Sequence, residues 1–393
     1  MNRLMTVLMM TLVALASLRP AAAQVKYNVT TLPLLTGAKA ARPTAINNIG
    51  QVAGLTPSST TSKTYKGWVW SPATATSAAN IQALAPLPGL PRSEALDIND
   101  EGYVVGNSSD GSTVVKATLW LPGQYASPVD LNAPSVKGAF LSNWVLKTAI
   151  AVSNLITGST DTLNGGCYVV CVGDKIDPVT GVKTTNFSQG VVCTIKGGIM
   201  VSAAELTIPA GADATDPWPD PKDVNNKGQV SGIYSGGYYN SANVTNTKWC
   251  CIWDATSGSV LQAVAGLENE AINDAGTVTG QNFDSQGYIL AYGAADAQML
   301  PAGFNSAGDS YQSISFGINN KNEVVGQSPE GGTYPAYLWV PTSGGQFNFY
   351  RLNDCVPYLR GRHLRKATGI NESSSIICEG TLSNVGRAFL LTK

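Results

Sequence analysis

A twelve-residue phrase recurs along this chain and constrains its fold more than any other feature. It reads ALDINDEGYVVG at residues 95–106, and close copies occupy 43–54, 221–232, 269–280 and 315–326. Two more divergent copies lie at 149–158 and 367–378. The central Asn recurs 46 to 72 residues apart, with Ser153 in its place in the third copy. Repetition at that interval indicates an array of one structural unit.

Each copy predicts a β-hairpin followed by two further strands. The Asn bonds its own backbone, and the Gly takes a left-handed conformation in the tight turn. A third strand of small, aromatic and aliphatic residues follows at 67–70, 117–120, 250–253 and 336–339, with weaker copies at 190–193, 287–290 and 388–391. A fourth, more variable strand comes next, as at 260–264 and 347–352.

Four antiparallel strands in about 50 residues match the size of a propeller blade. The last unit stops after its third strand, at Leu391, while residues 27–35 form an additional strand ahead of the first copy. That segment can complete the last blade and remove the exposed edges of an open array. We therefore predict an all-β fold, a β-propeller of seven four-stranded blades in one domain, 24–393, and a monomer.

Residues 1–23 have the pattern of an export signal. Arg3 precedes an apolar run at 4–17, and Ala21, Ala22 and Ala23 offer a cleavage site before Gln24. No later stretch approaches the roughly 20 apolar residues of a membrane span. We expect cleavage near Ala23 and a secreted or periplasmic protein without a membrane span.

The composition argues against two classes of site. Charged residues make up only 13% of the chain and acids slightly outnumber bases, which disfavours nucleic-acid binding. Seven Cys and a single His, without a C-x-x-C pair, disfavour a zinc site. Cys167 and Cys171 fall in an expected surface insertion at 161–188 of the third unit. Cys378 stands where the last copy should end in Gly, and a bond from it to Cys355 stays open.

The recurring I-N-x-x-G-x-V-x-G pattern, followed by a strand like A-F-L-W, resembles the bacterial extracellular HAF-repeat family. The resemblance covers nearly all of the chain after about residue 43. It implies an exported, propeller-like β protein, and it implies no catalytic residues. The chain departs from the family pattern in the third unit and at Cys378.

Two of the copies suggest a calcium site. Asp97 and Asn99, and likewise Asp223 and Asn225, partly match the D-x-N-x-D-G calcium loop, although neither copy has the acid expected further on. Their alternative role is structural, because Asn side chains bond the backbone in turns. These four residues are the candidate metal ligands, with Ca²⁺ as the possible cofactor.

The loops that lead into the innermost strands hold the candidate catalytic residues. In a propeller these strands line a central channel, so we expect Glu94, Glu270 and Asp216 to converge at its mouth. His363, in the basic run 360–366, is a possible general base. Solvated loop charges are the alternative interpretation of all four.

Two functions remain open. One is a small-molecule-binding propeller whose enzymatic form is a Ca²⁺-dependent hydrolase of lactones or esters, an analogy of architecture alone. The other is a non-catalytic propeller of the cell envelope that binds a glycan or a protein. The absence of known catalytic motifs and the aromatic loop 234–239 favour the second. Whether the protein is an enzyme is left undecided by the sequence.

Overall fold

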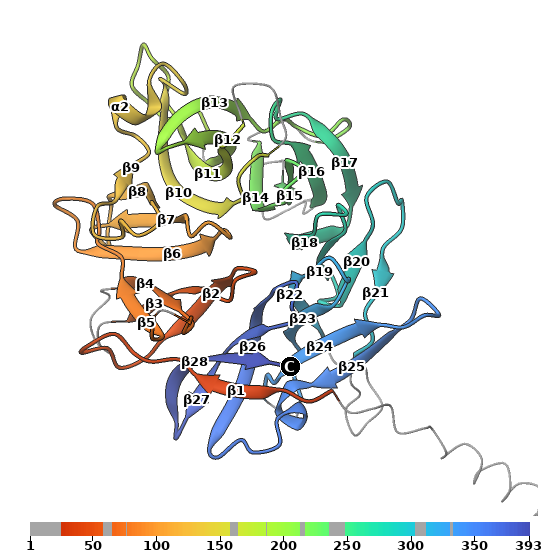
Figure 1. The fold of residues 1–393 in the computed structure, drawn as a ribbon. Helices are drawn as coiled ribbons and strands as arrows, with labels where there is room; N and C mark the ends of the chain where they lie inside the picture. The colour runs from red at the N-terminus through yellow and green to blue at the C-terminus, as the bar shows by residue number, and fades with distance from the viewer. Residues whose placement is uncertain are drawn as a thin grey trace, which may run out of the picture.

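The computed structural model describes residues 25–57, 65–75, 77–157, 164–185, 187–212, 217–235, 248–302, 312–330 and 333–393. These residues form seven four-stranded antiparallel sheets arranged in a ring around a central axis (Figure 1). The predicted seven-bladed β-propeller is therefore confirmed. The expected export signal at 1–23 and the catalytic candidate Asp216 lie outside the described residues.

Each of the first six blades takes four consecutive strands, ordered from the channel outward. The strands of blades 1 to 3 are β2 (Arg42–Ile46), β3 (Val52–Pro57), β4 (Tyr65–Ser71) and β5 (Asn80–Ala83); β6 (Arg92–Ile98), β7 (Val104–Ser109), β8 (Val115–Trp120) and β9 (Val129–Asp130); and β10 (Trp144–Val152), β11 (Cys167–Lys175), β12 (Gln189–Lys196) and β13 (Ile199–Glu205). A four-residue helix, α2 (Pro134–Lys137), precedes blade 3.

Blades 4 to 6 repeat this arrangement. Their strands are β14 (Trp218–Val224), β15 (Gln229–Ser235), β16 (Trp249–Asp254) and β17 (Val260–Ala265); β18 (Leu267–Ile272), β19 (Val278–Asn282), β20 (Gly287–Leu290) and β21 (Gln298–Met299); and β22 (Ile314–Ile318), β23 (Val324–Gln327), β24 (Ala336–Pro341) and β25 (Phe347–Arg351). A 3-10 turn, η1 (Leu352–Cys355), leads into blade 7.

Blade 7 joins the two ends of the chain. It contains β26 (Arg362–Ile370), β27 (Ile376–Leu382) and β28 (Val385–Thr392), and β1 (Asn28–Thr31) pairs with β28 as its outermost strand. Tyr27 and Leu32, on either side of β1, are both 1% exposed. The predicted closure by the N-terminal segment is confirmed, because β28 would otherwise present an unpaired edge.

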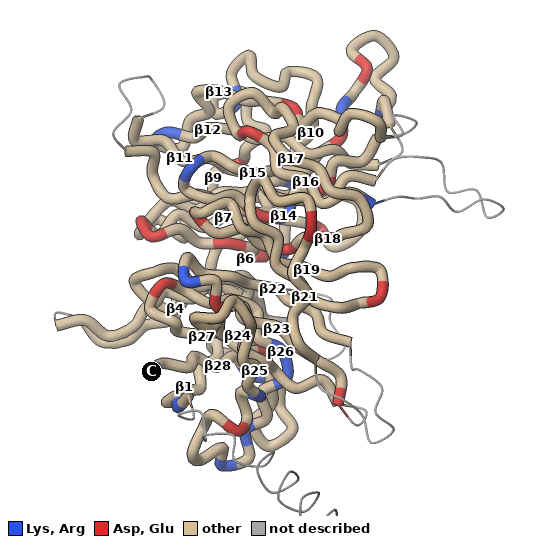
Figure 2. The backbone as a smooth tube through the Cα atoms, turned by 90° about the vertical axis from the view of Figure 1, so that its right-hand side faces the viewer, with Lys and Arg blue, Asp and Glu red and all other residues tan. Residues whose placement is uncertain are grey.

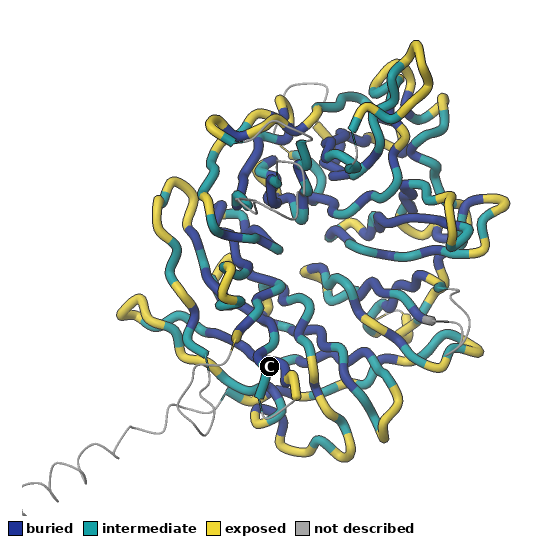
Figure 3. Tube along the Cα trace, turned by 180° about the vertical axis from the view of Figure 1, so that it is seen from behind, coloured by how far each residue is buried: buried dark blue, intermediate teal, exposed yellow. Residues whose placement is uncertain are grey.

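The core lies between the blades, where third-strand aromatic residues pack. The exposed parts of the chain are mostly loops at the rim, as Figure 3 shows. Trp120, Trp253 and Trp339 are fully buried, and each indole N–H donates to a backbone carbonyl oxygen in the loop after the preceding fourth strand, at 2.7 to 2.8 Å. The recurring Trp of the sequence pattern thus fills the space between blades while its polar atom stays satisfied.

Blade 3 corrects part of the sequence interpretation. Its second strand is β11 (Cys167–Lys175), so Cys167 and Cys171 are buried residues of a blade strand, where the sequence indicated a surface insertion. Ser153 accepts the Tyr168 N–H as Asn99 accepts the Tyr103 N–H, so the insertion lengthens the turn before the strand. With the third copy at 149–158, we expected a short turn and a second strand that begins earlier than Cys167.

Blades 3 and 7 share a departure from the other five. Cys171 and Cys378 face Ala149 and Ala367, where the other blades place the final Gly of the phrase opposite the inner strand. All seven cysteines lie in the described part of the chain, and all are buried and free of disulfide bonds. The suggested bond between Cys355 and Cys378 is therefore absent. In the described residues no helix has the length and apolar character needed to cross a membrane.

Candidate functional site in the axial channel

The inner strands end at the hairpin turns, where the repeated Asn residues are buried. Each Asn side chain forms hydrogen bonds through both its oxygen and its nitrogen. Each Asn Oδ1 accepts the backbone N–H four residues ahead, as Asn99 does from Tyr103 at 2.8 Å. Each Nδ2 donates to the backbone carbonyl of the equivalent residue in the next blade, at 2.8 to 3.1 Å, in six of the seven blades. Ser153 breaks the series because it has no amide nitrogen. The turn-capping interpretation is confirmed, and the same residues join the blades.

A second ring surrounds the axis one residue further on. Each member donates its backbone N–H to the side-chain oxygen of the next member, at 2.7 to 3.0 Å around all seven blades. We call it the mouth ring: Asn48, Asp100, Asn154, Asn226, Asp274, Asn320 and Glu372. The sequence analysis missed it, although the signal was available: the residue after the Asn position carries a side-chain carbonyl oxygen in every copy.

The mouth ring borders a cavity of about 190 Å³ that is lined by five carboxylates and no Lys or Arg. Asp100 and Asp274 each accept hydrogen bonds from two neighbouring Asn side chains, at 2.7 to 3.2 Å. Burial raises the pKa of Glu372, and the charge of Asp274 raises it further. This end of the channel is therefore acidic, with its carboxylates held in place by amides.

Asp97 and Asp223 lie one layer deeper, line both cavities and are partly buried. Asp97 accepts the N–H groups of Ile98 and Val152, both at 2.8 Å, so it joins blade 2 to blade 3. Asp223 joins blade 4 to blade 5 through the N–H groups of Val224 and Ile272. Burial raises the pKa of Asp97 to about 6, and burial together with the charge of Asp97 raises the pKa of Asp223 to about 7.

A bulge in every inner strand turns one additional residue toward the channel. The register slips at the residue three before the Asn position in all seven blades. We call these residues the bulge ring: Thr44, Leu96, Ile150, Lys222, Glu270, Phe316 and Thr368. Together with Asp97 and Asp223 they line a second cavity of about 190 Å³. Because a bulge redirects a side chain, the residue at this position determines which chemical group faces the channel.

Glu270 differs from the other acids of this region. Its carboxylate has no hydrogen bond or ion pair with the described part of the chain, and burial raises its pKa against the opposing charges of Lys222 and Lys366. Lys222 bonds Asp220 at 2.8 Å. Lys366 lies 3.8 Å from the ring centroid of Phe316, and burial lowers its pKa.

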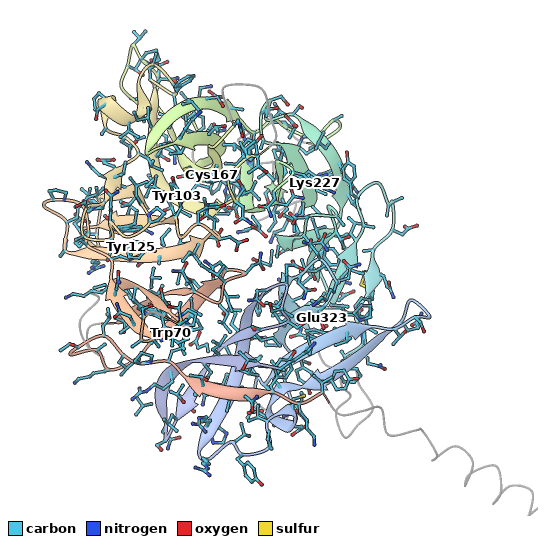
Figure 4. All side chains as sticks on the ribbon, viewed as in Figure 1. Trp70, Tyr103, Tyr125, Cys167, Lys227 and Glu323 are labelled. Atoms are coloured by element: carbon cyan, nitrogen blue, oxygen red, sulfur yellow. The ribbon has the colours of Figure 1, made fainter. Side chains whose placement is uncertain are left out.

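The opposite end of the channel, where the inner strands begin, carries paired charges. Arg42 pairs with Glu379 at 3.3 Å, and Lys248 pairs with Glu268. Glu94 accepts only a long bond of 3.3 Å from the Asn107 amide. Figure 4 shows the side chains on the ribbon, with those of the inner strands around the centre of the ring.

The predicted catalytic residues do not form one cluster. Glu270 lies in the channel, Glu94 lies near the start of β6, and His363 is exposed on β26 in a groove between blades 6 and 7. Among the metal candidates, Asp97 and Asp223 reach the channel, whereas the Oδ1 atoms of Asn99 and Asn225 accept turn N–H groups.

Metal binding at these residues remains a prediction. Among the described residues, no three His, Cys, Asp or Glu side chains lie close enough to hold a metal ion. No known protein family matches the chain, and a search of curated proteins finds no similar sequence.

Proposed function

We propose that this protein is a ligand-binding propeller that takes a small polar molecule into its axial channel, with Glu270 as the main polar contact. The observation that carries the proposal is the half-buried Glu270 carboxylate, which faces a cavity and has no hydrogen-bond or ion-pair partner among the described residues. An unpaired buried acid costs stability and is found most often where a ligand or a reaction uses it. Lys222 and Lys366 bring positive charge to the same region.

The expected ligand carries hydroxyl or amino groups that donate to Glu270. The cavity of about 190 Å³ suits a ligand no larger than a single sugar or amino acid. A thermal-shift screen of monosaccharides, amino acids and lactones tests the proposal, with calorimetry on the hits. Binding should weaken at least about tenfold in Glu270→Gln, because a hydrogen bond to a charged group is lost.

Glu330→Gln is the matched control, since Glu330 pairs with Arg351 on blade 6, outside the residues that line the channel. This variant should bind as the wild type does. A ligand that binds Glu270→Gln and wild type equally would show that Glu270 is not the contact. A screen without any hit would refute the axial site.

An enzymatic form of the same proposal is a Ca²⁺-assisted hydrolase of lactones or esters. Two features favour it: burial raises the pKa of Glu270, the direction that general-base catalysis requires of a carboxylate, and the turn-side cavity is lined by carboxylates without a basic residue. Turnover of a lactone and ester panel, with Ca²⁺ and with excess chelator, tests it. Full activity in chelator would refute the calcium step, and full activity of Glu270→Gln would refute the general base.

We further propose export and membership of the HAF-repeat family, supported by the apolar run at 4–17 and by the recurring phrase. N-terminal sequencing of the protein isolated from its native or a bacterial host tests export. Gln24 as the first residue of an extracytoplasmic form would agree with it. An intact N-terminus on a cytoplasmic protein would contradict it.

A further inference from the structure

The groove between blades 6 and 7 is separate from the axial channel. It has a volume of about 370 Å³, within the ~300–1,000 Å³ range of small-molecule sites. Its lining residues include two Arg, one His and one Tyr: Arg351, Arg365, His363 and Tyr334. No acid is among them. Figure 2 shows basic positions close to β25 and β26.

Blade 3 contains the same local structure and serves as an internal reference. In β10 an additional bulge at Lys147 follows Leu146, and in β26 the same bulge occurs at Arg365 after Leu364. Each Leu is held by an Asn side chain from the preceding loop, which bonds both its N–H and its carbonyl oxygen at 2.7 to 3.0 Å. The two sites can therefore be compared position by position.

The comparison reveals a missing acid. In blade 3, Asp174 stands opposite Val145, and its carboxylate binds Lys147 at 2.6 Å and Lys183 at 2.9 Å. In blade 7 the position of Asp174 is taken by Thr381, which stands opposite His363. Lys147, at the bulge of blade 3, thus has a carboxylate partner in Asp174. Arg365, at the bulge of blade 7, has none among the described residues.

The two Arg side chains that line this groove have correspondingly few partners among the described residues. Arg365 is exposed and forms no hydrogen bond or ion pair with the described residues. Arg351, on β25 of blade 6, replaces Asp130, which lies on β9 of blade 2. Arg351 has one ion pair with Glu330 at 3.5 Å, and its Nε–H has no acceptor within the described chain. A guanidinium has five donors that match a carboxylate in a fork.

We propose that this groove binds a carboxylate-bearing sugar, whose carboxylate takes the place that Asp174 fills in blade 3. Arg365 and Arg351 are its cationic partners. Tyr334, which is 55% exposed at the groove, offers an aromatic face for the sugar ring. The ligand class is a uronic acid, free or as a residue of an acidic polysaccharide.

Titration of the whole protein with D-glucuronate tests the proposal, with D-glucose as the neutral comparison. We expect saturable binding of glucuronate and at least about tenfold weaker binding of glucose. Arg365→Gln should weaken glucuronate binding at least about tenfold. Thr381→Asp should do the same, because it restores the internal carboxylate. Lys147→Gln, the matched bulge in blade 3, should bind as the wild type does.

Several results would overturn the proposal. These are the absence of saturable glucuronate binding, equal binding of glucose, and unchanged binding in Arg365→Gln. Inorganic phosphate or acetate binding more tightly than glucuronate would reduce the groove to a simple anion site and overturn the sugar assignment. Arg365 is exposed, so its variant should fold, and it keeps the test decisive should Thr381→Asp be unstable. An oligogalacturonide arm distinguishes a polymer end from a free uronic acid.

Discussion

Asp97 and Asp223 should make the propeller less stable as the pH rises from 5 to 8. Both carboxyls have ordinary pKa values near 3.8, raised in the folded state to about 6 and about 7. A carboxyl with a raised folded-state pKa gives stability that is fully present below pH ~4 and is lost as the pH rises through the raised value. At ~1.36 kcal/mol per pH unit, ionisation costs about 3 kcal/mol at Asp97 and about 4 kcal/mol at Asp223 by pH 8.

The measurable quantity is the part of that cost that falls between pH 5 and pH 8, about 4 kcal/mol for the two residues together. The double variant Asp97→Ala, Asp223→Ala should lose this pH dependence. Alanine is already present at the equivalent Ala45, Ala151 and Ala271, so the backbone accepts it.

Urea unfolding followed by Trp fluorescence at pH 5, 6, 7 and 8 gives the free energy of unfolding of each form. The difference between wild type and variant should change by about 4 kcal/mol across the series in favour of the variant. Asp296→Ala, at an exposed turn of blade 5, should keep the wild-type pH dependence. Parallel curves for wild type and double variant would refute the reasoning, since the two buried carboxyls would then not be the source.

Three further changes test the ring itself. Asn273→Ser removes the amide bond to the Asn319 carbonyl and should cost about 1–2 kcal/mol, seen as a lower Tm by calorimetry; an unchanged Tm would contradict the linking role. Gly106→Ala places a methyl group 1.8 Å from the Glu94 carbonyl oxygen and should cost about 2 kcal/mol or more in urea unfolding, whereas Gly344→Ala should be nearly neutral. A chain that begins at residue 35 lacks β1 and should melt lower and scatter more light than one that begins at residue 24; equal behaviour would argue against closure by β1.

The architecture was predictable because the repeat gives seven examples of one pattern. The Asn and Gly mark the turn, the Trp marks the third strand, and the incomplete last unit predicts the closing segment. Blade 3 was not predictable in the same way. Its turn is long, and Cys171 replaces the Gly that ends the phrase in five of the other blades, so both markers of the second strand are missing.

The site was less predictable, because residues in similar segments of different repeats face different surfaces. Glu270 and His363 each belong to segments that lead into inner strands, yet Glu270 faces the channel and His363 faces a groove between blades. The bulge decides which residue turns inward, and its position depends on the pairing register, which a single sequence does not show.

The bulge ring explains how one repeat can build both a scaffold and a site. The hydrogen-bonded layers around the channel conserve their chemistry from blade to blade: Asn caps the turn, and Asn, Asp or Glu closes the mouth ring. The bulge position keeps its geometry in all seven blades, yet it carries Thr, Leu, Ile, Lys, Glu, Phe and Thr in turn. A position under purely structural control would be expected to keep one kind of side chain, as the turn does. An asymmetric ligand requires a symmetric ring to present different side chains at one repeated position. The two charged residues of the bulge ring, Lys222 and Glu270, lie in adjacent blades and face the same cavity.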